Sequence, residues 1–145
     1  MQPAVQQLAT DLKAYGADIG LITETWLKKH HNNDLLGIDS YNLLRRDRIG
    51  RRGGGVAAYA STKLTSTIYK PSHEDDRFEI LWIKITVHLR NYYIGITYHP
   101  PKTVMYVDKE LIDYIGNNIN TIAKLDLESV IVLTGDFNQL SNDLI

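Results

Sequence analysis

Residues 78–87 restrict the fold of this sequence more than any other segment. Apolar side chains alternate along it, with Leu81, Ile83, Ile85 and Val87 on one face and Ile80 and Trp82 on the other. This period of two residues predicts a β-strand. Because both faces carry large apolar side chains, the strand needs packing partners, and we expect it inside a layered fold.

The rest of the chain predicts further strands and two helices. Apolar residues at helical spacing, followed by Gly16, indicate a helix over 3–15, and a second apolar stripe indicates a helix over about 107–122. Short apolar or β-branched runs predict strands at 19–23, 41–45, 56–61, 64–69, 92–98 and 130–134, whereas 28–37 is polar and irregular. The segment 92–98 returns beside 78–87 as an antiparallel hairpin. Mostly antiparallel strands with helices outside suit a layered α+β sandwich.

The two predicted helices can cover only one of the two apolar rows of residues 78–87. We therefore expect the other row to form an apolar patch larger than soluble monomers usually expose. Such a patch predicts self-association through an exposed sheet face, or incomplete folding of the chain alone.

Composition limits the classes of protein and of chemistry. The chain has 145 residues, 43% of them hydrophobic, which suits one globular domain or part of one. Its net charge of −1 carries no overall basic signature, so any attraction to nucleic acid must be local. The absence of cysteine excludes disulfides, thiolate zinc sites and cysteine nucleophiles.

The N-terminal residues show neither the basic start nor the apolar core of a signal peptide. No stretch of the sequence approaches the apolar length of a membrane span. We expect an intracellular protein of the nucleus or cytoplasm that is not secreted and has no membrane partner.

Two of the predicted strands end on acidic residues. The strand 19–23 leads into Glu24, and the strand 130–134 leads into Gly135, Asp136, Phe137 and Asn138. Two carboxylates delivered to one cleft would suit an oxygen-ligated Mg²⁺. Each motif alone has a plainer interpretation, because Gly-Asp is also a turn signal and Glu24 could belong to the start of a helix.

Five arginines lie close together before three successive glycines. They are Arg45, Arg46, Arg48, Arg51 and Arg52, ahead of Gly53–Gly55. The alternatives are contact with DNA phosphates, where glycine lets a backbone approach closely, and a solvated charged face. The glycines are not a P-loop, because the Gly-Lys-Ser/Thr continuation is missing. Of the remaining candidates, we interpret His99 as a surface loop residue, and Trp26 and Trp82 as core residues rather than base-stacking platforms.

Four motifs follow one another in a characteristic order: Glu24-Thr25-Trp26-Leu27, the arginine-rich stretch with Gly53-Gly54-Gly55-Val56, Tyr98-His99-Pro100-Pro101, and Gly135-Asp136-Phe137-Asn138. In this order they resemble the endonuclease/exonuclease/phosphatase superfamily. The residues of these motifs are most similar to those of the apurinic-type endonuclease domain of LINE- or Jockey-type non-LTR retrotransposons. The resemblance covers residues 5–142 and implies a four-layer α/β/β/α sandwich of the DNase-I-like kind.

The resemblance also implies roles for individual residues in Mg²⁺- or Mn²⁺-dependent hydrolysis of DNA. Glu24 matches the metal ligand, and Asp136 matches the residue that orients or deprotonates the attacking water. Asn138 matches a position that hydrogen-bonds the reacting phosphate. Tyr98 matches a tyrosine whose hydroxyl touches the scissile phosphate, although its plainer interpretation is a core ring at the end of a strand.

The sequence departs from the family at both ends. The family begins with a strand carrying a catalytic Asn, but no Asn precedes Asn32, and the family's Ser-Asp-His motif is absent. We therefore expect residues 1–145 to form a partial domain, about the first half, with little or no activity alone. Two alternatives stay open: a phosphatase or RNA nuclease of the same superfamily, and a non-catalytic remnant that only binds.

Overall fold

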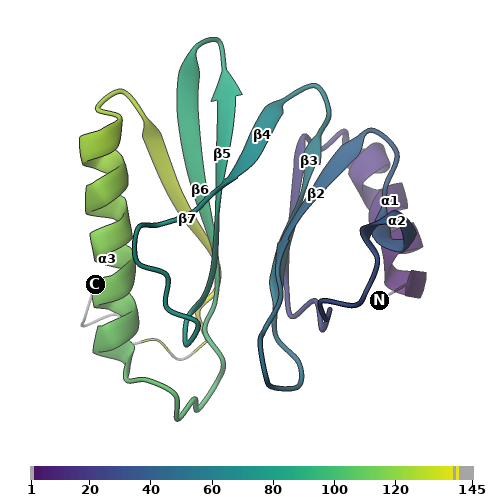
Figure 1. Cartoon of the computed structure of the whole chain (residues 1–145). Coiled ribbons are helices and arrows are strands. Elements are labelled where there is room, and N and C mark those ends of the chain that lie inside the picture. Colours follow the sequence, from purple (N-terminus) through teal and green to yellow (C-terminus); the bar gives the residue numbers. More distant parts are fainter. Residues whose placement is uncertain (1, 139, 141–145) are drawn as a thin grey trace.

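Two β-sheets lie face to face between two layers of helix in this computed structural model (Figure 1). The structure describes residues 2–138 and 140, so the end of the family resemblance at residues 141–142 lies outside them. The strands of the first sheet come from residues 19–61, and those of the second sheet come from residues 65–136. The predicted layered α+β architecture is confirmed.

The first sheet has three antiparallel strands in the order β1 (Ile19–Thr23), β3 (Val56–Ser61), β2 (Tyr41–Arg46). Every residue of the central strand β3 is buried. Helix α1 (Gln2–Tyr15) and the short helix α2 (Asn33–Leu36) pack on the outer face around Tyr59. Helix α2 corrects the expectation that 28–37 is irregular, because the Asn32 side chain caps it by accepting from the Asp34 N–H at 2.9 Å.

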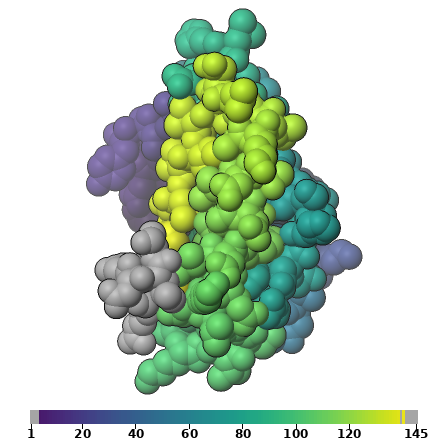
Figure 2. Space-filling view, turned by 90° about the vertical axis from the view of Figure 1, so that its left-hand side faces the viewer, coloured from purple at the N-terminus to yellow at the C-terminus, as the bar shows by residue number. Residues whose placement is uncertain are grey.

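The second sheet has the strand order β4 (Thr65–Tyr69), β5 (Glu79–Val87), β6 (Arg90–Tyr98), β7 (Val130–Asp136). The predicted β5–β6 hairpin is present, with both residues of its turn at positive φ. Strand β7 runs parallel to β6, and helix α3 (Asp108–Leu125) makes the crossover between them. Figure 2 shows α3 along the outer surface of this sheet, with part of β7 exposed beside it.

Between the sheets, Val56 and Ala58 of β3 pack against a row of larger residues on β5 and β6. On the opposite face of the second sheet, Trp82 packs against Leu111 and Ile115 of α3. The expectation that one row of residues 78–87 would lack cover is wrong, because Ile83 is 0% and Trp82 1% exposed. The chain supplies a second sheet for one row and a helix for the other.

Strand β1 lies over β6 and β7, and β2 lies over β4 and β5. The C-terminal ends of β1, β6 and β7 therefore carry the residues that follow them toward one end of the sandwich. Within the part of the chain that the structure describes, no helix is both long and apolar enough to span a bilayer.

The buried core predicts a sharp difference between two isoleucines. Replacing the fully buried Ile83 by Ala should lower the free energy of unfolding by about 3 kcal/mol, because it leaves a cavity between the sheets. The matched control Ile68→Ala, at a side chain that is 40% exposed, should cost less than about 1 kcal/mol. Urea denaturation measures both, and equal losses would contradict the two-sheet core.

Candidate active site

Glu24 and Tyr98 meet across the two sheets at one end of the sandwich. Glu24 follows directly after β1, and Tyr98 is the last residue of β6. The Tyr98 hydroxyl donates a hydrogen bond to the Glu24 Oε1 at 2.6 Å. Since the two residues belong to different sheets, this contact places an acidic side chain and a hydroxyl at the mouth between them.

The loop that carries Glu24 has an unusual backbone. Glu24 and Trp26 have φ values of 55° and 58°, in the left-handed region that is costly for residues other than glycine. The loop is held there by the glycine run, because the Trp26 N–H donates to the Gly54 carbonyl at 2.8 Å and the Thr25 N–H to the Gly55 carbonyl at 3.3 Å. The glycines thus let the backbone approach the Glu24 loop.

Glycine is required at these positions by both conformation and space. Gly54 and Gly55 have φ values of +67° and +88°. A Cβ on Gly55 would lie 2.5 Å from the Thr25 Oγ1, and one on Gly54 would lie 2.3 Å from the Glu79 Oε1. Any larger residue here would displace the Glu24 loop.

An ion pair between the buried Glu79 and the partly buried Arg48 supports this arrangement. Arg48 binds Glu79 through two hydrogen bonds, from Nη2 at 2.6 Å and from Nε at 3.0 Å, and the Glu79 Oε1 also accepts from the Gly55 N–H at 2.8 Å. The hydrogen bond to Glu79 raises the pKa of Arg48 above its ordinary value. The guanidinium carbon lies 5.7 Å from the centre of the Tyr98 ring. This pair therefore connects the glycine run to the tyrosine of the site.

Asp136 and Asn138 reach the same end of the sandwich from β7. Asp136 is the parallel partner of Tyr98, and strand alternation places it on the face toward the first sheet. Its Oδ1 accepts from the Asn138 N–H at 3.1 Å, and Asn138 has a φ of 46°. The chain does not continue as a strand here, because it turns at Asn138, whose side-chain amide donates to the His99 carbonyl at 2.6 Å.

His99 is a buried residue that anchors this turn. It is 4% exposed, and its Nδ1 lies 2.9 Å from the Tyr106 hydroxyl. Its Nε2 lies 3.4 Å from the Asp108 carboxylate, and its backbone N–H donates to the Asp136 carbonyl at 2.8 Å. The expectation of a surface residue is wrong, because the segment after Pro101 folds back and brings Tyr106 and Asp108 against the ring.

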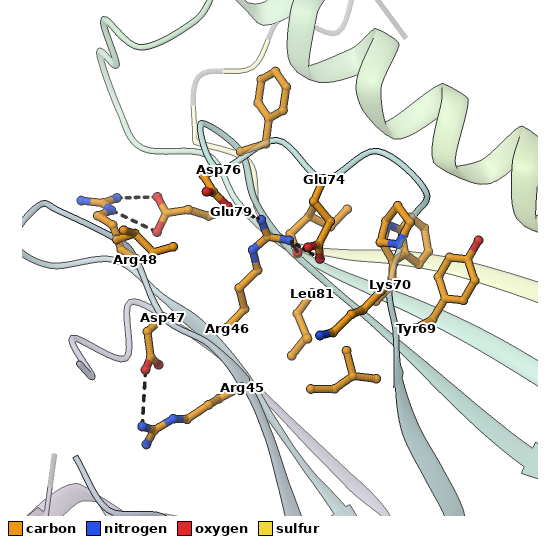
Figure 3. A pocket seen from close by; sticks show the side chains of 16 residues that line it. Arg45, Arg46, Asp47, Arg48, Tyr69, Lys70, Glu74, Asp76, Glu79 and Leu81 are labelled. Carbon is orange, nitrogen blue, oxygen red and sulfur yellow. Dashed lines mark hydrogen bonds and ion pairs between the residues drawn. The ribbon is translucent and has the colours of Figure 1, made fainter. Parts of the chain in front are cut away.

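The five arginines divide into two groups. Arg45 and Arg46 belong to β2, where Arg45 donates to the His31 carbonyl at 2.7 Å. Arg46 reaches across a cleft of about 320 Å³ toward Glu74 and Asp76 on the far side, whereas Arg48 faces Glu79 (Figure 3). Over residues 2–138, neither Arg51 nor Arg52 forms an ion pair. Those two guanidinium groups therefore have no carboxylate partner among these residues, and Arg52 lies instead over the Trp26 ring.

Trp26 also differs from its prediction. Its indole is 52% exposed, whereas Trp82 is buried as expected. The chain stays against the core here, since Thr25 and Leu27 are buried, and the left-handed backbone at Glu24 and Trp26 leaves the indole on the outside. Sequence reasoning also missed Glu79, although a single acid inside the apolar segment Phe78–Trp82 is a signal for a buried ion pair.

The carboxylates at this site suit a hard divalent cation that takes only one or two of its ligands from the protein. Among the described residues, no group of three or more His, Asp and Glu side chains could hold a metal ion. Mg²⁺ is commonly bound through one or two carboxylates and keeps several waters. Glu24 at the mouth between the sheets, with Asp136 at the same end, suits that mode of binding.

The Tyr98 hydroxyl stays protonated across the physiological range. Burial, and then the hydrogen bond to Glu24, raise the pKa of Tyr98 to about 12. The hydroxyl is therefore a neutral hydrogen-bond donor, and the Glu24 carboxylate beside it disfavours its ionisation.

The raised pKa of Tyr98 predicts a loss of stability at high pH. Ionisation begins near pH 10 in the unfolded chain but only near pH 12 in the folded one, so the unfolded state releases its proton first. The free energy of unfolding should fall between these values, and Tyr98→Phe should flatten the fall. Urea denaturation at several pH values tests this, with Tyr15→Phe at an 85% exposed side chain as the control. An unchanged pH dependence in Tyr98→Phe would contradict the prediction.

Breaking the Arg48–Glu79 pair should destabilise the protein strongly. Glu79→Ala leaves a largely buried guanidinium without its partner, which should cost roughly 3 kcal/mol in the free energy of unfolding. Lys109→Ala, which removes the exposed pair with Asp113, is the control and should cost less than about 0.5 kcal/mol. A loss for Glu79→Ala no larger than that of the control would show that the pair does not hold the site.

Comparison with known proteins agrees with this geometry. A model of the Endonuclease/Exonuclease/phosphatase family matches residues 1–144. No curated protein sequence matches the chain. Among solved structures, truncated TDP2 from Caenorhabditis elegans has a TM-score of 0.69 at 12% identity, over 99% of this chain and 58% of that one.

Two further structures are similar. TDP2 from D. rerio, solved with a single-strand DNA product, has a TM-score of 0.66 at 14% identity and covers 97% of this chain and 55% of that one. The endonuclease domain of TRAS1, a telomere-specific non-LTR retrotransposon, has a TM-score of 0.61 at 14% identity, with 97% and 61% covered. The chain thus spans less than two thirds of each of these three structures. By its family match and its fold, the chain belongs to the endonuclease/exonuclease/phosphatase family.

Proposed function

We propose that this site takes part in metal-dependent hydrolysis of a phosphodiester in DNA, as the endonuclease of a retrotransposon protein. The observation that carries the proposal is the contact of 2.6 Å between Glu24 and Tyr98, made from two different sheets beside Asp136. The similarity to the retrotransposon endonuclease TRAS1, together with the Glu24–Leu27 motif, supports the choice of DNA and of a mobile element.

The proposed roles follow from the position of each side chain. Glu24 would hold Mg²⁺ or Mn²⁺, and a divalent ion bound there neutralises charge on the phosphate and helps to ionise water. Asp136 would orient the attacking water and accept its proton. Tyr98 would donate its hydroxyl hydrogen bond to a phosphate oxygen. The Asn138 amide uses one N–H for the His99 carbonyl and has a second for the phosphate.

The structure supports a smaller set of DNA-binding arginines than the sequence predicts. Arg45, Arg46 and Arg48 are engaged by internal hydrogen bonds and ion pairs. We assign the phosphate contacts to Arg51 and Arg52, which adjoin the glycine run that holds the Glu24 loop. The other three would act by holding β2 and the Tyr98 ring in place.

Metal binding is the first test, because it does not require turnover. Glu24→Gln keeps the shape of the side chain but removes its charge, so we expect affinity for Mn²⁺ to fall at least about tenfold. Isothermal titration with Mn²⁺ and competition by Mg²⁺ measure this. The control Asp113→Asn removes an exposed carboxylate on α3 and should bind as the native chain does. Equal affinity in Glu24→Gln would exclude Glu24 as the ligand.

Nicking of supercoiled plasmid with Mg²⁺ tests the reaction. We expect slow nicking that Asp136→Ala abolishes, because loss of one member of a cooperating set typically costs several orders of magnitude. RNA and a phosphomonoester serve as alternative substrates. Faster cleavage of either would favour the nuclease or phosphatase alternatives, and metal binding without any cleavage would favour a fragment that only binds.

A further inference from the structure

An exposed aromatic ring lies beside the proposed active site without a role in the reaction. Trp26 is two residues beyond Glu24, and its indole is 52% exposed. Its backbone has a φ of 58°, which is rare for a bulky residue. Burial of the ring itself does not explain this conformation, because the ring is exposed between the buried residues Thr25 and Leu27. Strained residues of this kind concentrate at ligand-binding sites.

The ring is nevertheless held in a fixed position. Its backbone N–H donates to the Gly54 carbonyl at 2.8 Å. Gly53 lies close against the indole, since an added Cβ would be 3.4 Å from the ring carbon Cε2. The Arg52 guanidinium carbon lies 5.3 Å from the ring centre. The Arg52 guanidinium therefore lies over the Trp26 ring, and an aromatic ring and a cation are the two groups that bind a nucleotide.

The surroundings of the ring leave space for a ligand. A shallow, largely apolar cleft of about 500 Å³ opens beside it, within the range of small-molecule sites. Its walls come from α1, the end of β1 and the loop after β1: Ala4, Leu8, Ile22, Glu24, Thr25 and Trp26. The cleft therefore connects the Trp26 indole with the Glu24 carboxylate, which we propose as the metal ligand.

We propose that Trp26, together with Arg52, is a stacking platform for an unpaired nucleobase adjacent to the scissile phosphate. This inference rests on the proposed function and specifies its substrate as DNA with at least one unstacked base at the cut. A base in regular duplex already stacks on its neighbours and offers no free face, so the platform selects single-stranded or locally opened DNA.

Intrinsic fluorescence of the native chain tests the contact directly. The chain has two tryptophans, and Trp82 is 1% exposed, so quenching by a bound oligonucleotide reports on Trp26. A single-stranded thymidine oligonucleotide should quench the emission. An abasic oligonucleotide of the same length, which keeps the phosphates but lacks the bases, should bind without comparable quenching.

Anisotropy of labelled oligonucleotides measures the contribution to affinity. Base stacking should make the thymidine oligonucleotide bind roughly 5- to 150-fold more tightly than the abasic one. Trp26→Leu should abolish that preference, whereas Trp26→Phe should keep most of it. Tyr15→Leu, an exposed aromatic at the far end of α1, is the matched control and should change nothing.

The outcomes separate the two proposals. Binding of both oligonucleotides with equal affinity and no quenching would overturn the stacking platform while leaving the proposed function standing. Failure of the native chain to bind either oligonucleotide would overturn both. Because the quenching experiment uses the native protein, it decides the question even if Trp26→Leu does not fold.

Discussion

The largely buried pair of Arg48 and Glu79 is the interaction on which the site depends. It joins the segment after β2 to the beginning of β5, and Glu79 also binds the glycine run through the Gly55 N–H. Burial of two charges is costly unless their hydrogen-bonding groups are satisfied. Here Arg48 donates to both carboxylate oxygens and to the Arg52 carbonyl. The pair thus locks three separate segments into one geometry behind Glu24 and Tyr98.

The rigidity that this pair provides is matched by strain at the site. Glu24, Trp26 and Asn138 all have positive φ, and all three adjoin the end of the sandwich where the proposed chemistry takes place. In each case a hydrogen bond from a distant segment or from a neighbouring turn holds the conformation. The strained backbone conformations therefore occur where the side chains must point in particular directions. The stability of the surrounding strands offsets the free-energy cost of this strain.

The local sequence pattern predicts most of the helices and strands, but it does not predict which side chains contact one another. Alternation located β5, and the short apolar runs located β1 and β3, because each signal lies within a few residues. The burial of His99 depends on Tyr106 and Asp108, and the role of Arg48 depends on Glu79, 31 positions away. The exposure of Trp26 depends on backbone angles in its loop. Each of these facts depends on a contact or a backbone angle that the residue's own neighbours do not specify, so the sequence pattern predicts the wrong surroundings for His99 and Trp26 and leaves the alternatives for the arginines open.

Because the site is divided between two sheets, the packing of the apolar interior affects the geometry of the site. Glu24 directly follows β1 of the first sheet, whereas Tyr98 and Asp136 belong to the second. The separation of the sheets is set by small residues such as Val56 and Ala58 against larger ones such as Ile96. Close-packed interiors transmit displacements. A bulkier residue at Ala58 would widen the mouth between Glu24 and Tyr98, so residues that lie outside the site set the distance between its two halves.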